Sequence, residues 1–363
     1  MDTHPIARKG FFALLAIAVL SPVFTACSSD EAPSPVPADP LVIGAILPMT
    51  GPYARYGIEE RQAALLALGE EAGNDIRVIF ADSAGDSDQA MAHYKRLTTS
   101  ERAKAVFTAA SWISNAIYPL AAKDNVLHIV VASGAFTRSL KADEAVRFTV
   151  GIPDEAARLE EYLKQFNRAA LLYMDNDFGK DWTTQLKSSL KDKVVAAESY
   201  APDATDYSKQ LTAVQSKAPD VLVLLSSDGQ ASLIATQARQ QGMNAPLAST
   251  RPVEGPLLFQ GGDAVNGLVY SYPSFDTKHP FVKKFRDKYS AEPTVFGAEM
   301  YDAIVTLARA HRQCGNKPTC LADSYRGNSF VGALGKVTFD KVGDAHYPII
   351  LKQVKNGTFQ PYP

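Results

Sequence analysis

The sequence predicts an α/β protein in which two doubly wound lobes contain mainly parallel sheets. Short apolar runs alternate with helical patterns along residues 41–363, and this alternation is typical of βαβ units whose sheets are covered by helices. The strand candidates are too many for one comfortable open sheet. The pattern also restarts after Gly151-Ile152-Pro153, so we expect two lobes.

Each predicted element follows from its hydrophobic period. Leu41–Leu47 is a continuous apolar run ended by Pro48, as expected of a strand buried on both faces. Ile58–Glu71 then shows helical spacing with charge on one side. Further strands are expected at Ile76–Ala81, Ala105–Thr108, Val126–Ala132, Ala169–Tyr173, Val194–Ala197, Val221–Leu225 and Leu268–Tyr272. Further helices are expected at Gln89–Ser100, Glu155–Phe166, Trp182–Leu190, Tyr207–Lys217, Ser232–Gln241 and Glu299–Arg312. Val337–Phe339 and Ile349–Val354 follow, the latter as a closing β pair that ends in Asn356-Gly357.

Residues 1–26 are predicted to be a secretory signal peptide. Ten apolar residues, Phe11–Leu20, follow two basic residues, a run too short for the roughly 20 residues of a membrane-spanning helix. Phe24–Cys27 resembles a bacterial lipobox, so Cys27 is expected to be lipidated and to become the mature N-terminus. The alternative is cleavage near Ala26, which would give a soluble exported protein with one loose thiol.

Residues 27–40 are expected to form the lipidated cysteine and a disordered tether. The stretch 28–40 contains four prolines and almost no large apolar side chain, so it buries too little surface to offset its ordering entropy. We therefore expect a periplasmic protein anchored to a membrane by lipid. Ser28, in place of an aspartate, favours the outer membrane by resemblance to sorted lipoproteins.

The length of the chain allows two domains, and its charge argues against one class of partner. From residue 41 onward the chain is long enough for two domains. The formal net charge of −2 argues against nucleic acid, because neutralising phosphates needs a basic surface.

Two cysteines remain if lipid occupies Cys27. In CGNKPTC, Cys314 and Cys320 are separated by a spacer that contains Gly315 and Pro318 and can turn back on itself. In an exported chain this favours a local disulfide. A metal site is the alternative, but no histidine or third cysteine lies nearby in the sequence, and we expect neither a metal nor a cofactor.

Six motifs in order resemble one known family. They are Leu47–Gly57 (LPMTGPYARYG), the stretch from Asp82-Ser83 to Asp88-Gln89-Ala90, Asp175–Gly179, Gln237–Arg239, Met300–Ala303 and Val337–Asp340. Together, over essentially all of residues 41–361, they resemble the leucine/isoleucine/valine-binding family, the type I periplasmic solute-binding proteins of ABC transporters.

The resemblance implies two α/β lobes joined by three hinge crossings, in the arrangement called a Venus flytrap. One lobe would comprise residues 41–150 and 276–334, and the other residues 151–275 and 335–363. The resemblance also implies a monomeric, non-enzymatic receptor that binds a small polar ligand, amino-acid-like or a carboxylate or amide. Closure on the ligand is what an ABC permease would sense.

Two loops at predicted strand ends carry candidate ligand-binding residues: Ser111, Trp112 and Ser114 in the first, and Ser133, Gly134, Ala135 and Thr137 in the second. Ligands of such sheets bind outside the carboxyl ends of strands, and a helix start suits a carboxylate. The resemblance assigns Ser111 to the ligand carboxylate and the second loop to the same group. The alternatives are an ordinary N-cap by Ser111 or Ser114 and a plain turn at the second loop.

Aromatic side chains are the expected walls of the site. The resemblance places Tyr56 and Phe178 on opposite lobes, with Phe296 as a further candidate. Trp112 is an addition of this sequence, beside a polar loop. An aromatic residue is more often part of the core, but Trp112 is the one we most expect to face the cleft.

Arg251 stands where amino-acid binders of the family carry an acidic residue for the ligand ammonium. An arginine would repel an ammonium and favour a carboxylate, carbonyl or amide. The alternative is a structural arginine between the lobes, and Asp228 or Glu254 could still provide a negative charge. We hypothesise that the ligand is not a plain branched-chain amino acid.

Two other functions remain open at this point. A ligand-sensing regulatory or chemosensory protein would have the same fold, and the chain alone does not distinguish it from a transport receptor. An exported hydrolase would be expected to show a nucleophile elbow, an HExxH zinc motif, a phosphate loop or a CxxC pair, and the sequence contains none of these. A dispersed catalytic triad would leave no such motif, but nothing in the sequence requires one, and we predict no catalytic residues.

Overall fold

A computed structural model describes residues 39–72, 75–138, 140 and 144–363. The predicted signal peptide, the lipidation site Cys27 and all but the last two residues of the tether lie outside the described residues. No helix in the described part of the chain is both long and apolar enough to span a membrane.

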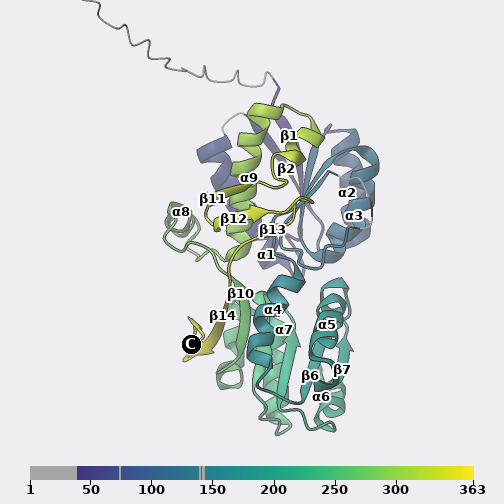
Figure 1. Cartoon of the computed structure of the whole chain (residues 1–363), viewed down its shortest axis with the longest axis vertical. Coiled ribbons are helices and arrows are strands. Elements are labelled where there is room, and N and C mark those ends of the chain that lie inside the picture. The colour runs from purple at the N-terminus through teal and green to yellow at the C-terminus, as the bar shows by residue number, and fades with distance from the viewer. Residues whose placement is uncertain (1–38, 73–74, 139, 141–143) are drawn as a thin grey trace, which may run out of the picture. The chain divides into compact units, whose positions relative to one another are not determined.

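The first sheet has five parallel strands in the order β2-β1-β3-β4-β5; β1 and β2 are labelled in Figure 1. They are β1 (Leu41–Leu47), β2 (Ile76–Asp82), β3 (Ala105–Thr108), β4 (Leu127–Val130) and β5 (Ala145–Arg147). Side chains of β1 alternate between two covered faces. Ile43 and Ala45 pack toward α1 (Ala54–Ala67) and α9 (Val295–Cys314), whereas Ile46 packs toward α2 (Ser87–Thr99) and α3 (Ser111–Asp124). Burial on both faces explains the continuous apolar run.

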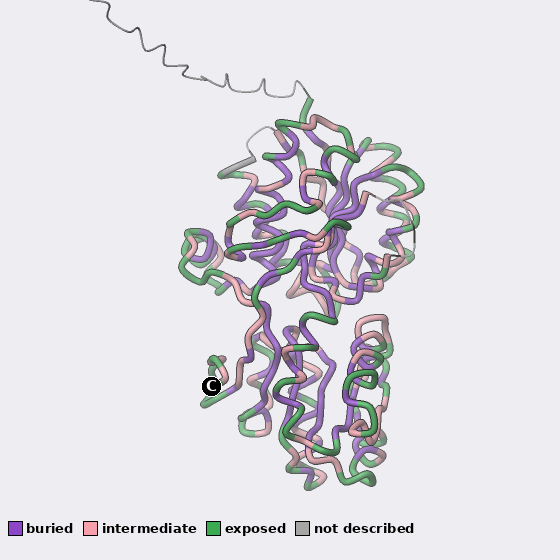
Figure 2. Tube along the Cα trace, in the orientation of Figure 1, coloured by how far each residue is buried: buried purple, intermediate pink, exposed green. Residues whose placement is uncertain are grey.

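The second sheet has seven strands in the order β15-β14-β10-β9-β8-β6-β7. Five are parallel: β6 (Ala169–Met174), β7 (Val194–Tyr200), β8 (Val221–Leu225), β9 (Leu247–Ser249) and β10 (Val269–Pro273). α4 (Ile152–Leu163) and α5 (Asp177–Leu190) cover one face, and α6 (Ser208–Gln215) and α7 (Asp228–Gln240) cover the other. Figure 2 shows the strands of both sheets as largely buried. The predicted α/β fold with mainly parallel sheets is confirmed.

The C-terminal pair of strands completes the second sheet at its antiparallel edge. β14 (Ile349–Lys355) pairs with β10 and with β15 (Thr358–Pro361). Asn356 and Gly357 between them both have positive φ, at 52° and 69°, as a two-residue hairpin turn requires. The predicted closing pair is confirmed.

A third sheet has three strands, which come after β10 and before β14 in the sequence. It contains β11 (Ser329–Gly332), β12 (Gly335–Phe339) and β13 (Ala345–His346). Asp344 forms a parallel bridge with Arg147 at the end of β5, so this sheet adjoins the first one. The chain thus passes between the two main bodies three times: after β5, after β10 and after β13.

The remaining elements are short, none longer than 10 residues. They are α8 (Pro280–Tyr289), α10 (Pro318–Asp323), the π-helical turn η1 (Leu68–Ala72) and the 3₁₀ segments η2 (Lys191–Lys193), η3 (Arg251–Val253) and η4 (Pro256–Val265). Cys314, at the end of α9, and Cys320, in α10, form a disulfide with 5.5 Å between their Cα atoms.

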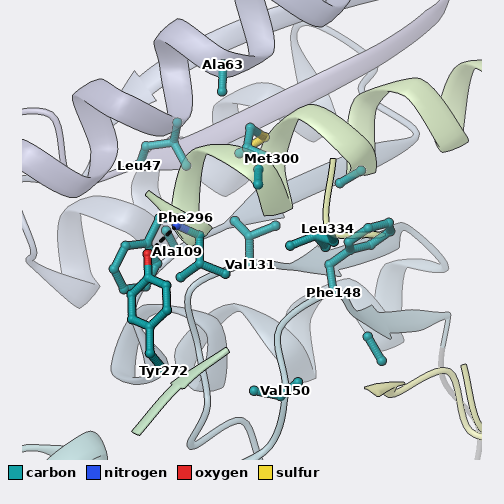
Figure 3. Close-up of a cluster of buried hydrophobic side chains, with 14 of the residues drawn as sticks. Leu47, Ala63, Ala109, Val131, Phe148, Val150, Tyr272, Phe296, Met300 and Leu334 are labelled. Carbon is teal, nitrogen blue, oxygen red and sulfur yellow. Dashed lines mark hydrogen bonds between the residues drawn. The ribbon is translucent and has the colours of Figure 1, made fainter. Parts of the chain in front are cut away.

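The core between the first sheet and α9 extends to the chain crossings (Figure 3). Phe148 and Val150 follow β5 and are fully buried. The hydroxyl of Tyr272, at the end of β10, accepts a hydrogen bond of 2.9 Å from the backbone N–H of Val295 (Figure 3). This bond joins the second crossing to the start of α9.

Candidate functional site

A cavity lies where the strand order of both sheets reverses. The first sheet reads β2-β1-β3-β4-β5 and the parallel part of the second reads β7-β6-β8-β9-β10, so each reverses beside its first strand. Ligands of doubly wound sheets bind at such points, outside the carboxyl ends of the strands. The cavity is lined by Pro48, Tyr53, Tyr56, Ala109, Ala110, Ser111, Trp112, Ala132, Gly134, Met174, Phe178, Ser227, Arg251, Pro252 and Phe296.

The cavity has room for a small molecule. About 70 Å³ is open to the centre of a water-sized sphere, whereas one water needs only about 10–15 Å³ on that measure. Its walls come from loops after β1, β3 and β4 of the first sheet and after β6, β8 and β9 of the second. A bound molecule would therefore touch both sheets.

Five aromatic rings give the cavity its apolar character. Tyr53 packs on Trp112 with ring centroids 5.0 Å apart, and Tyr56 meets Phe296 nearly edge to face, at 5.1 Å and 82°. Phe178 lines the cavity from the start of α5. Such rings suit an apolar or aromatic ligand body. Burial raises the pKa of Tyr53, which Asp203 raises further, and that of Tyr56, each to about 12, so both phenols are neutral at pH 7.

Tyr56 also reaches across to η3, the segment that follows β9 of the second sheet. Its hydroxyl donates a hydrogen bond of 2.8 Å to the carbonyl oxygen of Pro252. Arg55 covers the ring of Tyr56, with its guanidinium carbon 4.2 Å from the ring centroid, and its Nε lies 3.5 Å from a carboxylate oxygen of Asp228. These contacts fix the position of the Tyr56 ring in the wall.

The polar end of the cavity lies at the start of α3. Ser111 is the first residue of this helix and is 2% exposed, and its Oγ accepts a hydrogen bond of 3.2 Å from the backbone N–H of Ala135. Among the described residues no acceptor takes the Ser111 hydroxyl proton, so it can be donated to a ligand, and the helix N-terminus favours a negative charge. Ser227 lines the cavity from the opposite sheet, at the N-cap of α7.

Two alanines in these loops have a strained backbone conformation. Ala110, before α3, has a φ of 72°, and Ala132, after β4, has a φ of 47°. A non-glycine residue in this region costs on the order of 1–3 kcal/mol. Both residues line the cavity, so the surrounding fold maintains this strain at the site.

The structure separates the residues predicted in the two loops. Ser111, Trp112 and Gly134 line the cavity, while Ala135 and Thr137 line a neighbouring cavity instead. Trp112 also donates a hydrogen bond of 2.8 Å from its Nε1 to the carbonyl oxygen of Gly85.

Ser114 and Ser133 lie behind the cavity in a fully buried network of hydroxyls. The Oγ of Ser114 is 2.8 Å from Thr108 Oγ1 and 2.8 Å from Ser133 Oγ. Thr108 in turn lies 2.7 Å from His128 Nε2. Burial, with a smaller effect of the Arg138 charge, lowers the pKa of His128 to about 3, so its imidazole is neutral. The network supports the loops from behind.

Of the predicted walls, Tyr56, Phe178 and Phe296 all line the cavity. The lining also includes residues that were not predicted from the sequence, among them Tyr53, Met174, Ser227 and Pro252. Ser227 could have been found, because it follows the predicted strand Val221–Leu225 at its carboxyl end. Met174 similarly ends β6, but an apolar residue there looks like any core residue.

Arg251 lines the cavity, yet its guanidinium is directed at protein acceptors. Nε donates to Glu155 at 2.8 Å, Nη1 to Thr149 at 2.5 Å and Glu299 at 3.4 Å, and Nη2 to the carbonyl oxygen of Val150 at 3.0 Å. Nη2 also lies 2.5 Å from Glu155. Burial alone would lower the pKa of Arg251, but Glu155 and Glu299 hold it raised.

The other two charges considered from the sequence also have partners. Asp228 pairs with Arg55 and accepts from the backbone N–H of Leu257 at 3.2 Å. Glu254 lies 2.5 Å from the Nζ of Lys352. Neither lines the cavity, and among the described residues its lining contains no acidic side chain. The described residues also include no cluster of three or more potential metal ligands.

Comparisons with known proteins agree with this geometry. The sequence profile of a family described as periplasmic binding protein matches residues 40–358. A Leu/Ile/Val-binding protein of Rhizobium johnstonii is 24% identical over 327 residues, which cover 84% of this chain and 88% of that protein.

Solved structures show the same fold. An extracellular ligand binding receptor from Desulfohalobium retbaense is 40% identical with a TM-score of 0.85; the match covers 89% of this chain and 59% of that one. A leucine binding protein from Thermotoga maritima is 24% identical with a TM-score of 0.80, covering 89% and 98%. An ABC transporter solute binding protein from R. palustris in complex with benzoate is 22% identical with a TM-score of 0.81, covering 89% and 95%.

The match to the family profile spans most of the chain, and the two-lobed fold agrees with it. The chain therefore belongs to the periplasmic binding proteins of type I, in the leucine/isoleucine/valine-binding family of solute receptors.

Proposed function

We propose that this protein is a periplasmic lipoprotein that delivers a small ligand to an ABC importer. Its ligand is a carboxylate with an apolar or aromatic body and no ammonium group. The protein acts as a monomer, anchored by lipid on Cys27, and performs no chemical reaction on the ligand.

One observation carries the choice of ligand: an apolar, ring-lined cavity ends at a helix N-terminus, and its described lining includes no acidic side chain. The carboxylate would lie against Ser111 and the start of α3, where the helix dipole and hydroxyl stabilise it. The rings of Trp112, Tyr56 and Phe296 would hold the rest of the molecule.

None of the described residues that line the cavity would offer an α-ammonium a negative counter-charge. Transfer of an unpaired charge from water into such a site is strongly unfavourable. Arg251 adds a positive group to the wall, although Glu155 and Glu299 balance it. The Rhizobium relative is named for binding leucine, isoleucine and valine; we propose that this chain has departed from that ligand class.

The fold also accommodates ligands of the proposed kind. The solute binding protein from R. palustris, which has the same fold, holds benzoate. Benzoate combines one carboxylate with one apolar ring, and we use it as a probe for this chain.

For the lobes, we propose one change from the sequence-based division into residues 41–150 with 276–334 and residues 151–275 with 335–363. Residues 335–346 belong with the first lobe. β12 and β13 pair with β11, and Asp344 accepts hydrogen bonds from Arg138 at 2.9 Å and Arg147 at 2.6 Å.

The test is a thermal-shift screen of the purified protein with carboxylates, their amides, aromatic amines and amino acids. Tight binders raise the melting temperature by mass action. We expect benzoate-like and branched carboxylates to raise it, and their amides and amines to have little effect. If amino acids stabilise the protein and simple carboxylates do not, the proposed ligand class is wrong.

A further inference from the structure

We propose that Arg251 is a positioning residue of the hinge, which ties the cavity wall to all three chain crossings. It acts through a buried network, here called the hinge network, that consists of Arg251, Glu155, Glu299, Thr149, Ser271 and Tyr347. All six side chains are at most 7% exposed.

At the first crossing, between β5 and α4, Arg251 makes direct contacts. Its guanidinium donates to the hydroxyl of Thr149 and to the carbonyl oxygen of Val150. The Thr149 hydroxyl in turn donates to Glu299 on α9 at 2.8 Å. The backbone of this crossing is therefore held between Arg251, in the 3₁₀ segment η3 that follows β9, and helix α9 of the first lobe.

The second and third crossings are reached through the two carboxylates. Glu155, which pairs with Arg251, accepts a hydrogen bond of 3.0 Å from Ser271 in the middle of β10, the strand that leads into the second crossing. Glu299 accepts one of 2.6 Å from the hydroxyl of Tyr347, which lies between β13 and β14. Each carboxylate thus connects Arg251 to a different crossing.

The same network reaches the cavity wall from the other side. Arg251 itself lines the cavity, and the backbone N–H of Ala132, another lining residue, donates to Glu299 at 2.9 Å. A movement at the crossings must therefore change contacts of two wall residues. Since burial makes an unpaired charge costly, the network favours one discrete arrangement.

The consequence is a coupling between hinge angle and affinity. Weakening the network away from the cavity should let ligand-free protein sample other hinge angles. Affinity should then fall by the same factor for every ligand, because only the fraction of binding-competent protein has changed. A ligand-contact residue would instead change the ranking of ligands.

The test uses two variants that do not line the cavity, Tyr347→Phe and Ser271→Ala. Tyr325→Phe is the matched control, because it removes another buried phenol hydroxyl, 3.3 Å from Thr306 on α9 and outside the hinge network. Asp88 on α2 and Lys187 on α5 are exposed, and each is replaced by a cysteine that carries a spin label. Double electron–electron resonance then measures the distance between the two lobes. The background carries Cys27→Ser to avoid a third labelling site.

We expect both variants to broaden or shift the ligand-free distance distribution, and Tyr325→Phe to leave it unchanged. Calorimetry with benzoate and 4-methylpentanoate should show both ligands weakened equally, by about tenfold for the loss of one hydrogen bond to a charged group. Unchanged distances in both variants, or a loss confined to one ligand, would overturn the proposal. This second readout rests on the proposed function. If neither carboxylate binds the parent protein, the ligand class fails and the distances alone decide the hinge role.

Discussion

The clearest stability prediction concerns Glu155→Gln. Glu155 is fully buried and accepts hydrogen bonds from Arg251 and Ser271. The substitution keeps the shape of the side chain but removes its charge. Arg251 would then retain Glu299, 3.4 Å away, as its remaining charged partner.

The expected cost follows from the burial of the pair. Removing one partner of a buried ion pair typically costs about 3–5 kcal/mol. Because Gln keeps an acceptor oxygen and Glu299 remains, we expect the lower end, about 3 kcal/mol. At about 2–4 °C per kcal/mol for a domain of 150–250 residues, the melting temperature should fall by about 6–12 °C.

The assay is thermal and urea unfolding followed by circular dichroism at pH 7. Glu161→Gln on the same helix is the control, because Glu161 is exposed and pairs with Arg158 at the surface. It should change the free energy of unfolding by less than about 0.5 kcal/mol. A cost below about 1 kcal/mol for Glu155→Gln would refute the view that this carboxylate is a structural partner of Arg251.

Three other predictions concern different parts of the molecule. Glu60 is fully buried, and neither of its carboxylate oxygens has a hydrogen-bond partner in the part of the chain that the structure describes. Burial, then Glu299 and Glu59, raise its pKa well above the usual value. Glu60→Met should raise the free energy of unfolding in urea by about 1–3 kcal/mol. The gain should be larger at pH 8 than at pH 5, because the carboxyl of the unfolded parent chain loses its proton before that of the folded one as the pH rises. Destabilisation at both pH values would contradict this. The lowered pKa of His128 means that the unfolded chain binds a proton between about pH 6.5 and 3 while the folded one does not, so stability should fall by about 1.4 kcal/mol per pH unit below 6.5. In His128→Gln that component should be absent from the pH dependence, and an unaltered slope would count against it. Trp112 lines the cavity while Trp182 is 1% exposed in the core, so a bound ligand should change tryptophan emission in the parent and not in Trp112→Phe; a full ligand-induced change in that variant would exclude contact with Trp112.

The sequence predicted strands better than helix starts. The predicted Leu41–Leu47, Ala105–Thr108 and Val221–Leu225 coincide with β1, β3 and β8, because strands buried on both faces are continuous apolar runs. Helix α5 was expected from Trp182 but begins at Asp177. The reason is a cap: the side chain of Asn176 accepts from the backbone N–H of Gly179 at 3.0 Å, and such polar residues carry no hydrophobic period.

The site was predictable to the level of its loops. Strand ends and the family resemblance pointed to Ser111, Trp112 and Arg251, which all line the cavity. The partners of Arg251 were not predictable, because Glu155 and Glu299 lie 96 and 48 residues away in the chain. Only the folded arrangement of the three crossings brings these charges together.

The most direct measurement is titration calorimetry with a matched pair of ligands, leucine and 4-methylpentanoate. The two share a carboxylate and a branched apolar chain and differ by the ammonium group. We predict that 4-methylpentanoate binds at least about tenfold more tightly, because an ammonium would be buried without a counter-charge. Tighter binding of leucine would contradict the account of a cavity that excludes amino acids.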